Sequence, residues 1–323
     1  MCQHHQTAVT LYSYLKLALK KLTLKCHKAE SWQLIAFKHE PNYPSECKAM
    51  FSTGKTLPKK LYIIGILVIF VCVYAQYFVK LGQITGYLVV YGIPILVVSL
   101  MFGKEMLQRA AKNVKTASQL GLGLFGAFTT LSIFLSIIAL MILLQFNPQT
   151  LDLLSKPNPV LDVPPNVAWI MIAVSLLVVG PAEEYIFRGF MYGGLLNITK
   201  GKHWLPMAVA SSFLFAAVHA YYAITYEAAS VVPFITIITF SIAMSITYYW
   251  SGGNLLVPAL IHGLYDATGF LGVATTTEIG LYARGALIFV GVLFAAVLLL
   301  RKILINPKKY SSETGPNPVP PLA

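Results

Sequence analysis

Six ionisable side chains stand inside otherwise apolar stretches of the chain. They are two neighbouring glutamates, an arginine, two histidines and an aspartate: Glu183, Glu184, Arg188, His219, His262 and Asp266. An ionisable group inside a membrane span is costly unless it is paired or in contact with water. A carboxylate beside histidines can deprotonate water, bind a metal ion, or do both. The set therefore indicates hydrolytic chemistry, with a proton or ion pathway as the main alternative.

The spacing of these residues follows the helical repeat. Glu184 and Arg188 are four residues apart, so they share a helix face and can form an ion pair. Glu183 lies about 100° round the same helix and is free for another role. His262 and Asp266 are also four residues apart. These two side chains can face one site together, or the carboxylate can orient the imidazole.

The elements that must hold these residues are membrane-spanning helices. Of the 323 residues, 57% are hydrophobic and 11% are charged, whereas soluble domains carry about 25% charged residues. Apolar runs of about 17–25 residues cross a bilayer as helices, because a helix satisfies its backbone polar groups internally. The sequence thus predicts an all-α, polytopic membrane helix bundle. About eight spans are expected, near residues 61–79, 85–102, 119–145, 166–195, 205–224, 230–250, 254–273 and 283–303.

The basic residues between the spans predict an orientation. They concentrate in alternate connections, such as 103–118 and 197–204, which puts both termini in the cytoplasm. With that topology, Glu183, His219, His262 and Asp266 lie at similar depths, roughly 12–21 Å from the inner ends of their helices. One shared site is therefore expected. Gly189, Gly193 and Gly194 are small enough to let a neighbouring helix come close.

The chain divides into three regions. Residues 1–58 are rich in lysine and histidine and are expected to be a disordered or interfacial extension. Residues 59–306 form the transmembrane bundle, and its motif region is 165–275. Residues 307–323 are a cytoplasmic tail. The net charge of +12 follows the loops and the extension, so it does not indicate nucleic-acid binding. Four scattered cysteines predict no disulfide framework.

Three motifs together carry a family resemblance. Residues 183–189 read EExxFRG, residues 215–219 read FxxxH, and residues 262–266 read HxxxD. In this order and spacing they resemble the CPBP family of CAAX proteases and bacteriocin-processing enzymes, also called the Abi family, which includes the type II CAAX prenyl endopeptidases. The resemblance covers about residues 165–275, and the N-terminal half matches only as generic membrane helices.

The resemblance implies an intramembrane endopeptidase with roles for each motif residue. Glu183 and His219 would activate the attacking water, while His262 and Asp266 would stabilise the oxyanion. Glu184 and Arg188 would support them. Prenyl endopeptidases commonly carry Asn where this chain has Asp266, and an ionised aspartate would repel an oxyanion. Either Asp266 is protonated, or it orients His262, or it ligates a metal.

The last alternative keeps a metalloprotease open, with Zn²⁺ as the candidate ion. Its ligands would come from Glu183, His219, His262 and Asp266.

The function predicted first is thus cleavage of a membrane-associated, prenylated or unprenylated, peptide or protein in the bilayer. A proton- or ion-coupled transporter and a non-catalytic immunity or scaffold relative are the alternatives. Polar residues concentrated in three helices at similar depth favour the enzyme over a transporter, which would line both halves of the membrane. The expected location is a multi-pass protein of a prokaryotic plasma membrane.

Overall fold

The computed structural model describes residues 58–79, 83–201 and 203–305. All of them belong to one unit of the chain, Phe51–Ala323. The predicted extension 1–58, apart from its last residue, and the predicted tail 307–323 lie outside the described residues. The predicted cytoplasmic location of both termini therefore stays a prediction.

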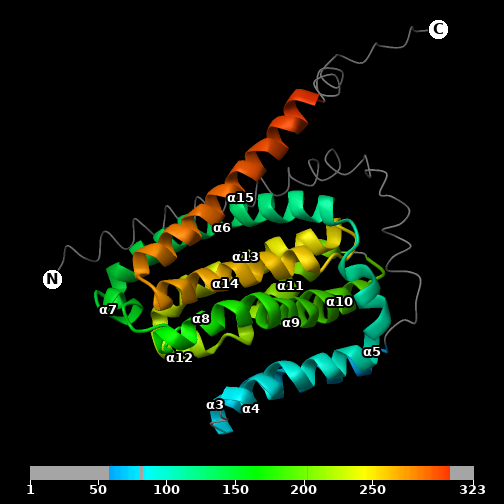
Figure 1. Cartoon of the computed structure of the whole chain (residues 1–323), viewed down its shortest axis with the longest axis horizontal. Helices are drawn as coiled ribbons and strands as arrows, with labels where there is room; N and C mark the ends of the chain where they lie inside the picture. Colours follow the sequence, from blue (N-terminus) through cyan, green and yellow to red (C-terminus); the bar gives the residue numbers. More distant parts are fainter. Residues whose placement is uncertain (1–57, 80–82, 202, 306–323) are drawn as a thin grey trace, which may run out of the picture. The chain divides into compact units, whose positions relative to one another are not determined.

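The described part of the chain is helical from end to end (Figure 1). The α-helices are α3 (Lys59–Val79), α4 (Gln83–Tyr87), α5 (Ile93–Ala110), α6 (Val114–Phe146), α7 (Thr150–Leu154), α8 (Pro165–Val174), α9 (Gly180–Glu184), α10 (Gly193–Ile198), α11 (Trp204–Ala217), α12 (Tyr221–Tyr226), α13 (Val231–Trp250), α14 (Leu256–Ala274) and α15 (Thr277–Ile305). The π-helical segments are η1 (Leu88–Gly92), η2 (Ser175–Val179) and η3 (Tyr185–Tyr192), and η4 (Glu227–Ser230) is a 3₁₀ helix.

Five helical stretches are long and apolar enough to cross a membrane among the described residues. They are Val114–Phe146, Pro165–Ile198, Tyr221–Trp250, Leu256–Ala274 and Thr277–Leu300. Two shorter apolar helices, Thr85–Met101 and Trp204–Ala217, accompany them. The prediction of an all-helical integral membrane protein is confirmed, whereas the count of about eight spans is not.

Three predicted boundaries are wrong. The predicted loop 103–118 is largely helical, because α5 continues to Ala110 and α6 begins at Val114. The predicted helix 205–224 breaks, since α11 ends at Ala217 and α12 begins at Tyr221. The last span begins at Thr277 rather than at 283. Each predicted boundary was placed where the composition changes between polar and apolar residues. The helices of the structure begin and end at other residues.

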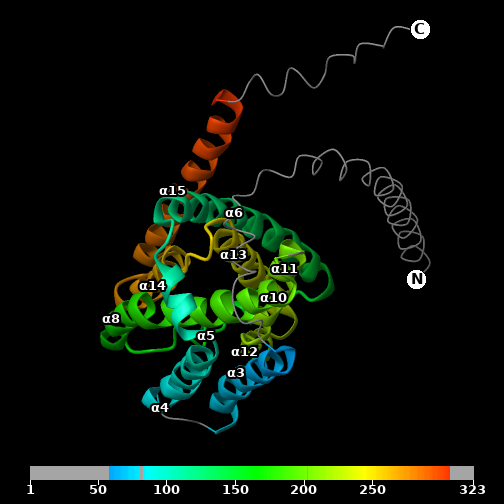
Figure 2. The ribbon, with the colours of Figure 1, turned by 90° about the vertical axis from the view of Figure 1, so that its right-hand side faces the viewer.

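The helices that carry the motifs pack around α14. One side of α14 lies against α8, η2 and α9, and another side lies against α15 and α6 (Figures 1 and 2). Helix α6 runs along both α13 and α15, and α11 packs against α13. The continuous stretch α8–η2–α9–η3–α10 is therefore held on one side by α14, and its η3 segment contacts α5 and α11.

Two apolar clusters flank the motif region. The first joins α3, η1, α5, η3 and the end of α11, and it includes Tyr62, whose hydroxyl donates to the carbonyl of Met191 at 2.6 Å. The second joins α6, α13 and α14 through residues such as Phe125, Met244 and Ile261. Ionisable residues between these clusters are thereby kept away from lipid.

Candidate active site

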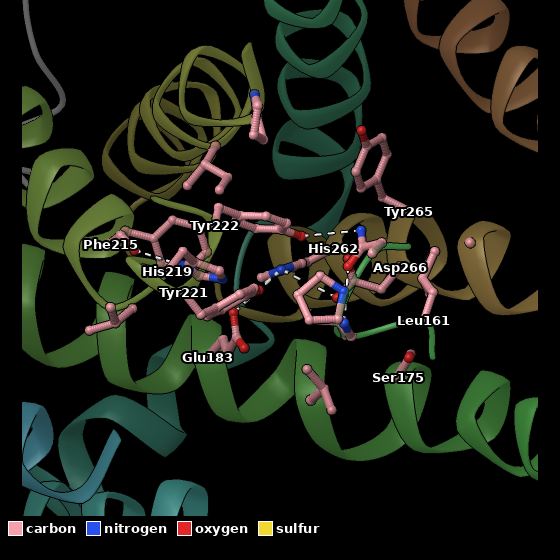
Figure 3. Close-up of a pocket in the computed structure, with 18 of the residues that line it drawn as sticks. Leu161, Ser175, Glu183, Phe215, His219, Tyr221, Tyr222, His262, Tyr265 and Asp266 are labelled. Atoms are coloured by element: carbon pink, nitrogen blue, oxygen red, sulfur yellow. Dashed lines mark hydrogen bonds and ion pairs between the residues drawn. The ribbon is translucent and has the colours of Figure 1, made fainter. Parts of the chain in front are cut away.

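A cavity of about 750 Å³ lies between the motif helices. Its wall takes side chains from α9, α14, the turn after α11, α12 and α13, and also from η1 and α15. Glu183, His219, His262 and Asp266 all line it, and Figure 3 shows these four side chains grouped in one place. The structure thus brings together residues that are up to 83 positions apart, from Glu183 to Asp266.

Glu183 reaches the cavity from the end of α9. Its Oε1 accepts a hydrogen bond from the hydroxyl of Tyr91 at 2.9 Å. Its Oε2 lies 3.5 Å from Nε2 of His262 and has no hydrogen-bond partner within the described residues. One carboxylate oxygen therefore accepts a hydrogen bond, while the other is buried and has no such partner among the described residues.

His262 stands at the centre of the charged groups. Its Nδ1 lies 2.8 Å from Oε1 of Glu184, and because a carboxylate only accepts, Nδ1 carries the hydrogen. Its Nε2 lies 3.5 Å from Glu183 Oε2 and 3.6 Å from Asp266 Oδ2. Two carboxylate oxygens, one from Glu183 and one from Asp266, therefore lie near the same nitrogen. Glu184, rather than Asp266, makes the hydrogen bond that orients this imidazole.

Glu184 and Arg188 form the ion pair that their spacing predicts. Nη1 of Arg188 donates to Oε1 of Glu184 at 2.8 Å, and both side chains are fully buried. The guanidinium also lies over the ring of Phe215, 4.7 Å from its centroid, which is a cation–π arrangement. Since Oε1 of Glu184 accepts from both Arg188 and His262, the pair couples α9 and η3 to α14.

His219 lies in the turn between α11 and α12, not within a helix. Its Nδ1 is 2.7 Å from the carbonyl oxygen of Phe215, and a carbonyl can only accept, so Nδ1 donates. In the neutral ring the lone pair then belongs to Nε2. Its ring stacks with Tyr222 at an interplanar angle of 9°. The turn therefore presents a proton-accepting nitrogen held by two contacts.

Asp266 lies one helical turn beyond His262 on α14. Its side chain is 32% exposed, against 12% for Glu183 and 6% for His262. Among the three, Asp266 is therefore the side chain most open to a molecule that enters the cavity.

Two glycines bring the helices of the site into backbone contact. A Cβ on Gly180 would lie 2.6 Å from the carbonyl oxygen of Ala259, and one on Gly263 would lie 2.7 Å from that of Ser175. Gly180 precedes Glu183 by one turn, and Gly263 follows His262 directly. This approach of α9 and η2 to α14 sets the short distances between their side chains, and the sequence analysis did not single out either glycine.

The glycines of the first motif region are also in tight places. A Cβ on Gly189 would lie 2.5 Å from Cε of Met106, and one on Gly194 would meet the ring of Tyr62. A Cβ on Gly193 would lie 3.2 Å from the Tyr248 hydroxyl. The expected close approach of neighbouring helices at these three positions is confirmed.

The helix that carries Glu183 and Glu184 is π-helical on both sides of α9, in η2 and η3. Tyr91 also lies in a π-helical segment, η1. Such segments add a residue to the helical turn and are found frequently at functional sites. The wider turn changes which side chains face the cavity, which a 3.6-residue periodicity does not predict.

Sequence reasoning did not single out Tyr91 or Arg284, which both line the cavity. Tyr91 lies in the generic N-terminal half, and no local pattern links it to Glu183, which is 92 positions away. Arg284 falls within the predicted span 283–303 but was not named as a site residue; it lies in the second turn of α15 and lines the cavity. A signal for the earlier start of this helix existed, because the run from Thr277 to Arg284 contains no proline.

The metal alternative finds no formed site in the described residues. No three side chains of His, Cys, Asp or Glu among them are arranged to hold a metal ion. Nδ1 of His219 and Nδ1 of His262 are both engaged in hydrogen bonds, so Nε2 is the nitrogen of each ring that faces the cavity. Since the four residues named as ligands form no such group here, no chemical step is derived through a metal.

Comparison with known proteins agrees with the motifs. Residues 165–268, about a third of the chain, match the family model described as type II CAAX prenyl endopeptidase Rce1-like. This match confirms the resemblance to CAAX proteases. It supports a membrane protease whose substrate is membrane-associated, and it covers all six ionisable residues. Neither the search of curated proteins nor the search of solved structures found a match.

Proposed function

We propose that the protein is an intramembrane endopeptidase that hydrolyses a peptide bond of a membrane-associated substrate, with a prenylated peptide as the first substrate to test. The observation that carries the proposal is the grouping of Glu183, His219, His262 and Asp266 around one cavity between membrane-spanning helices. The family match supports the same reaction class.

Glu183 is the proposed general base. Its free Oε2 takes a proton from a water molecule that also donates to Nε2 of His219. The water oxygen then bonds to the carbonyl carbon of the substrate, and the carbonyl π electrons move to its oxygen. Tyr91 keeps Oε1 of Glu183 occupied, so the proton goes to Oε2. General-base catalysis by a positioned side chain contributes about 10²–10⁴-fold.

His262 is the proposed donor to the oxyanion. Its Nδ1 hydrogen is held by Glu184, so the ring orientation is fixed and Nε2 faces the reaction centre. Asp266, 3.6 Å from Nε2, keeps the imidazole protonated in this proposal. Collapse of the intermediate breaks the C–N bond, and the proton on Glu183 passes to the leaving nitrogen. The products are a carboxylic acid, which then gives its proton to water, and an amine.

Cleavage of a fluorogenic farnesylated peptide by the purified protein tests the proposal. Wild type should cleave it, whereas Glu183→Gln and Glu183→Ala should lower the rate by at least about 10²-fold, because the base is gone. His219→Ala should behave similarly. Detergent melting temperatures close to that of wild type would show that these variants fold. Normal turnover by folded Glu183→Gln would contradict the proposal.

Two further experiments distinguish the metal mechanism from the metal-free one and the possible roles of Asp266. Chelator treatment that stops wild-type cleavage would favour the metal mechanism over water activated by Glu183 and His219. Asp266→Asn separates the roles of Asp266, because an amide can donate to an oxyanion but cannot hold an imidazolium by charge. Reduced cleavage is expected here, and unchanged or faster cleavage would assign Asp266 a protonated, donating role.

A further inference from the structure

His219 stands in a turn, so a regular helical backbone does not hold its side chain. Helix α11 ends at Ala217, and α12 begins at Tyr221. Nδ1 of the imidazole donates to the carbonyl oxygen of Phe215 at 2.7 Å, which sets the tautomer but still lets the ring tilt about that one bond. In the proposed reaction Nε2 must point at the water, so the plane of the ring needs a second support.

Tyr222 offers that support from the first turn of α12. The planes of the two rings are 9° apart and their centroids are 6.5 Å apart, which lies within the range of about 4.5–7 Å for offset-stacked aromatic pairs. The backbone N–H of Tyr222 also donates to the carbonyl oxygen of His219 at 3.1 Å. The stack continues to Tyr226, whose ring lies 5.8 Å away at 13°. Tyr222 and His219 both line the cavity (Figure 3).

A side chain from a different part of the chain holds the outer end of Tyr222. Nδ2 of Asn158 donates to the hydroxyl oxygen of Tyr222 at 3.4 Å. Oδ1 of the same amide accepts from the backbone N–H of Val160 at 3.0 Å, so the amide is oriented with its nitrogen toward the tyrosine. Asn158 belongs to the connection 155–164 between α7 and α8, and it also lines the cavity. The connection is thus joined to His219 through a single ring.

We propose that Tyr222 is a positioning residue for His219, and that Asn158 holds Tyr222 in place through its hydroxyl. This inference rests on the proposed endopeptidase function, in which Nε2 of His219 accepts a hydrogen bond from the attacking water. The ring of Tyr222 keeps the imidazole in the plane that directs Nε2 at this water. Tyr222 itself takes no part in making or breaking bonds.

Steady-state cleavage of the farnesylated peptide by the full-length purified protein separates the ring of Tyr222 from its hydroxyl. Tyr222→Leu removes the ring and should lower kcat at least about tenfold, because small displacements of catalytic groups are costly in rate. Tyr222→Phe keeps the ring and should recover most of that loss, leaving kcat about threefold below wild type for the missing hydrogen bond. KM should stay close to its wild-type value in both variants. A raised KM with unchanged kcat would assign Tyr222 to substrate binding and overturn the proposal.

Asn158→Ala tests whether Asn158 acts through Tyr222. Alone it should lower kcat about threefold, and combined with Tyr222→Phe it should add no further loss, because both changes remove the same hydrogen bond. Lys156→Gln is the matched control in the same connection, since it breaks the exposed ion pair with Glu227 at 3.3 Å, and it should leave kcat unchanged. Additive losses in the double variant, or an equal loss in Lys156→Gln, would overturn the proposed link from Asn158.

Nitrogen-15 spectra of protein labelled at histidine give a reading that needs no turnover. The signals of His219 are those that disappear in His219→Ala. Wild type and Tyr222→Phe should show one tautomer of the neutral ring, with the hydrogen on Nδ1, whereas Tyr222→Leu should shift the signals toward the average of both tautomers. Tyr222→Met replaces Tyr222→Leu if the latter lowers the detergent melting temperature.

Unchanged His219 signals without the Tyr222 ring would overturn the positioning role. A wild-type protein that shows the single tautomer and the expected change in Tyr222→Leu, yet cleaves no peptide, would count against the endopeptidase alone. The failure of this inference and the failure of the proposed function are therefore distinguishable.

Discussion

Two glycine contacts between helices in the described part of the chain differ in what surrounds them. At α9–η2 against α14, Gly180 and Gly263 stand beside the glutamates and His262. At α6 against α15, a Cβ on Gly291 would lie 2.8 Å from Cα of Gly126. Only 11% and 6% of the most apolar parts of α6 and α15 are buried, against 50% for α14.

Close packing through glycine therefore serves two different purposes at these two contacts. Between α6 and α15 the glycines allow dispersion contacts between helices whose outer faces are apolar and exposed to the lipid, and no ionisable side chain depends on the fit. Between α9 and α14 the same closeness fixes distances of 2.8–3.6 Å between charged atoms. A small shift there changes hydrogen bonds, so the effect on chemistry should exceed the effect on packing.

Arg188→Ala should have the largest effect of the variants that probe this contact. The change leaves Glu184 fully buried without its cation, and breaking a buried pair costs about 3–5 kcal/mol. Both the detergent melting temperature and the cleavage rate should fall strongly. An unchanged melting temperature would show that Glu184 is compensated in another way, and would weaken the distinction between the two contacts.

Gly263→Ala should come next. Its Cβ would lie 2.7 Å from the oxygen of Ser175 and 2.9 Å from Cα of Leu176. Both are backbone atoms, so α14 must move away from η2. We expect at least about tenfold slower cleavage with a stability loss of about 1–3 kcal/mol. Wild-type cleavage kinetics in this variant would mean that catalysis tolerates a larger separation of α14 from η2 than the short distances between the charged side chains suggest.

Tyr91→Phe should have a smaller effect. The substitution removes one hydrogen bond to Oε1 of Glu183 and keeps the ring that stacks on Tyr87. Net hydrogen bonds to charged groups contribute about 1.5–3 kcal/mol, so kcat should fall about tenfold with little change in KM or melting temperature. A change in KM alone would instead assign Tyr91 to substrate binding.

Gly291→Ala should affect stability and leave cleavage as it is. Overpacking costs about 1–3 kcal/mol, which detergent melting would register. Gly285→Ala is the control on the same helix, since a Cβ there meets no atom within 4 Å, and it should change neither measurement. Slower cleavage by Gly291→Ala would break the comparison, because it would tie the α6–α15 contact to the site.

The sequence predicted the local relations at the site and the grouping of its four residues, but it did not predict the hydrogen bonds that join separate helices. The four-residue interval between Glu184 and Arg188 predicted their ion pair, because it depends on one helix alone. The hydrogen bond from His262 to Glu184 joins two helices, and their relative rotation depends on the glycine contact and on the π-helical turns. The roles inferred for the motif residues stay predictions until cleavage is measured.

The other wrong predictions concern the residues at which helices begin and end. No glycine or proline marks the break at Val218–Ala220, so the apolar composition concealed the turn that holds His219. The opposite error occurred at Thr277, where threonines and Glu278 suggested a loop that is in fact the first turn of α15.

The position of Tyr91 in η1 has a consequence for any attempt to build a smaller catalyst. The matched segment 165–268 contains both glutamates, the histidines and Asp266, yet the hydroxyl that holds Glu183 comes from a helix some 70 residues upstream of it, and Arg284 comes from one downstream. A graft of the motif helices onto a new scaffold would need to rebuild both neighbours. Without them, the transplanted Glu183 would keep its sequence motif but would lose the hydrogen bond from Tyr91.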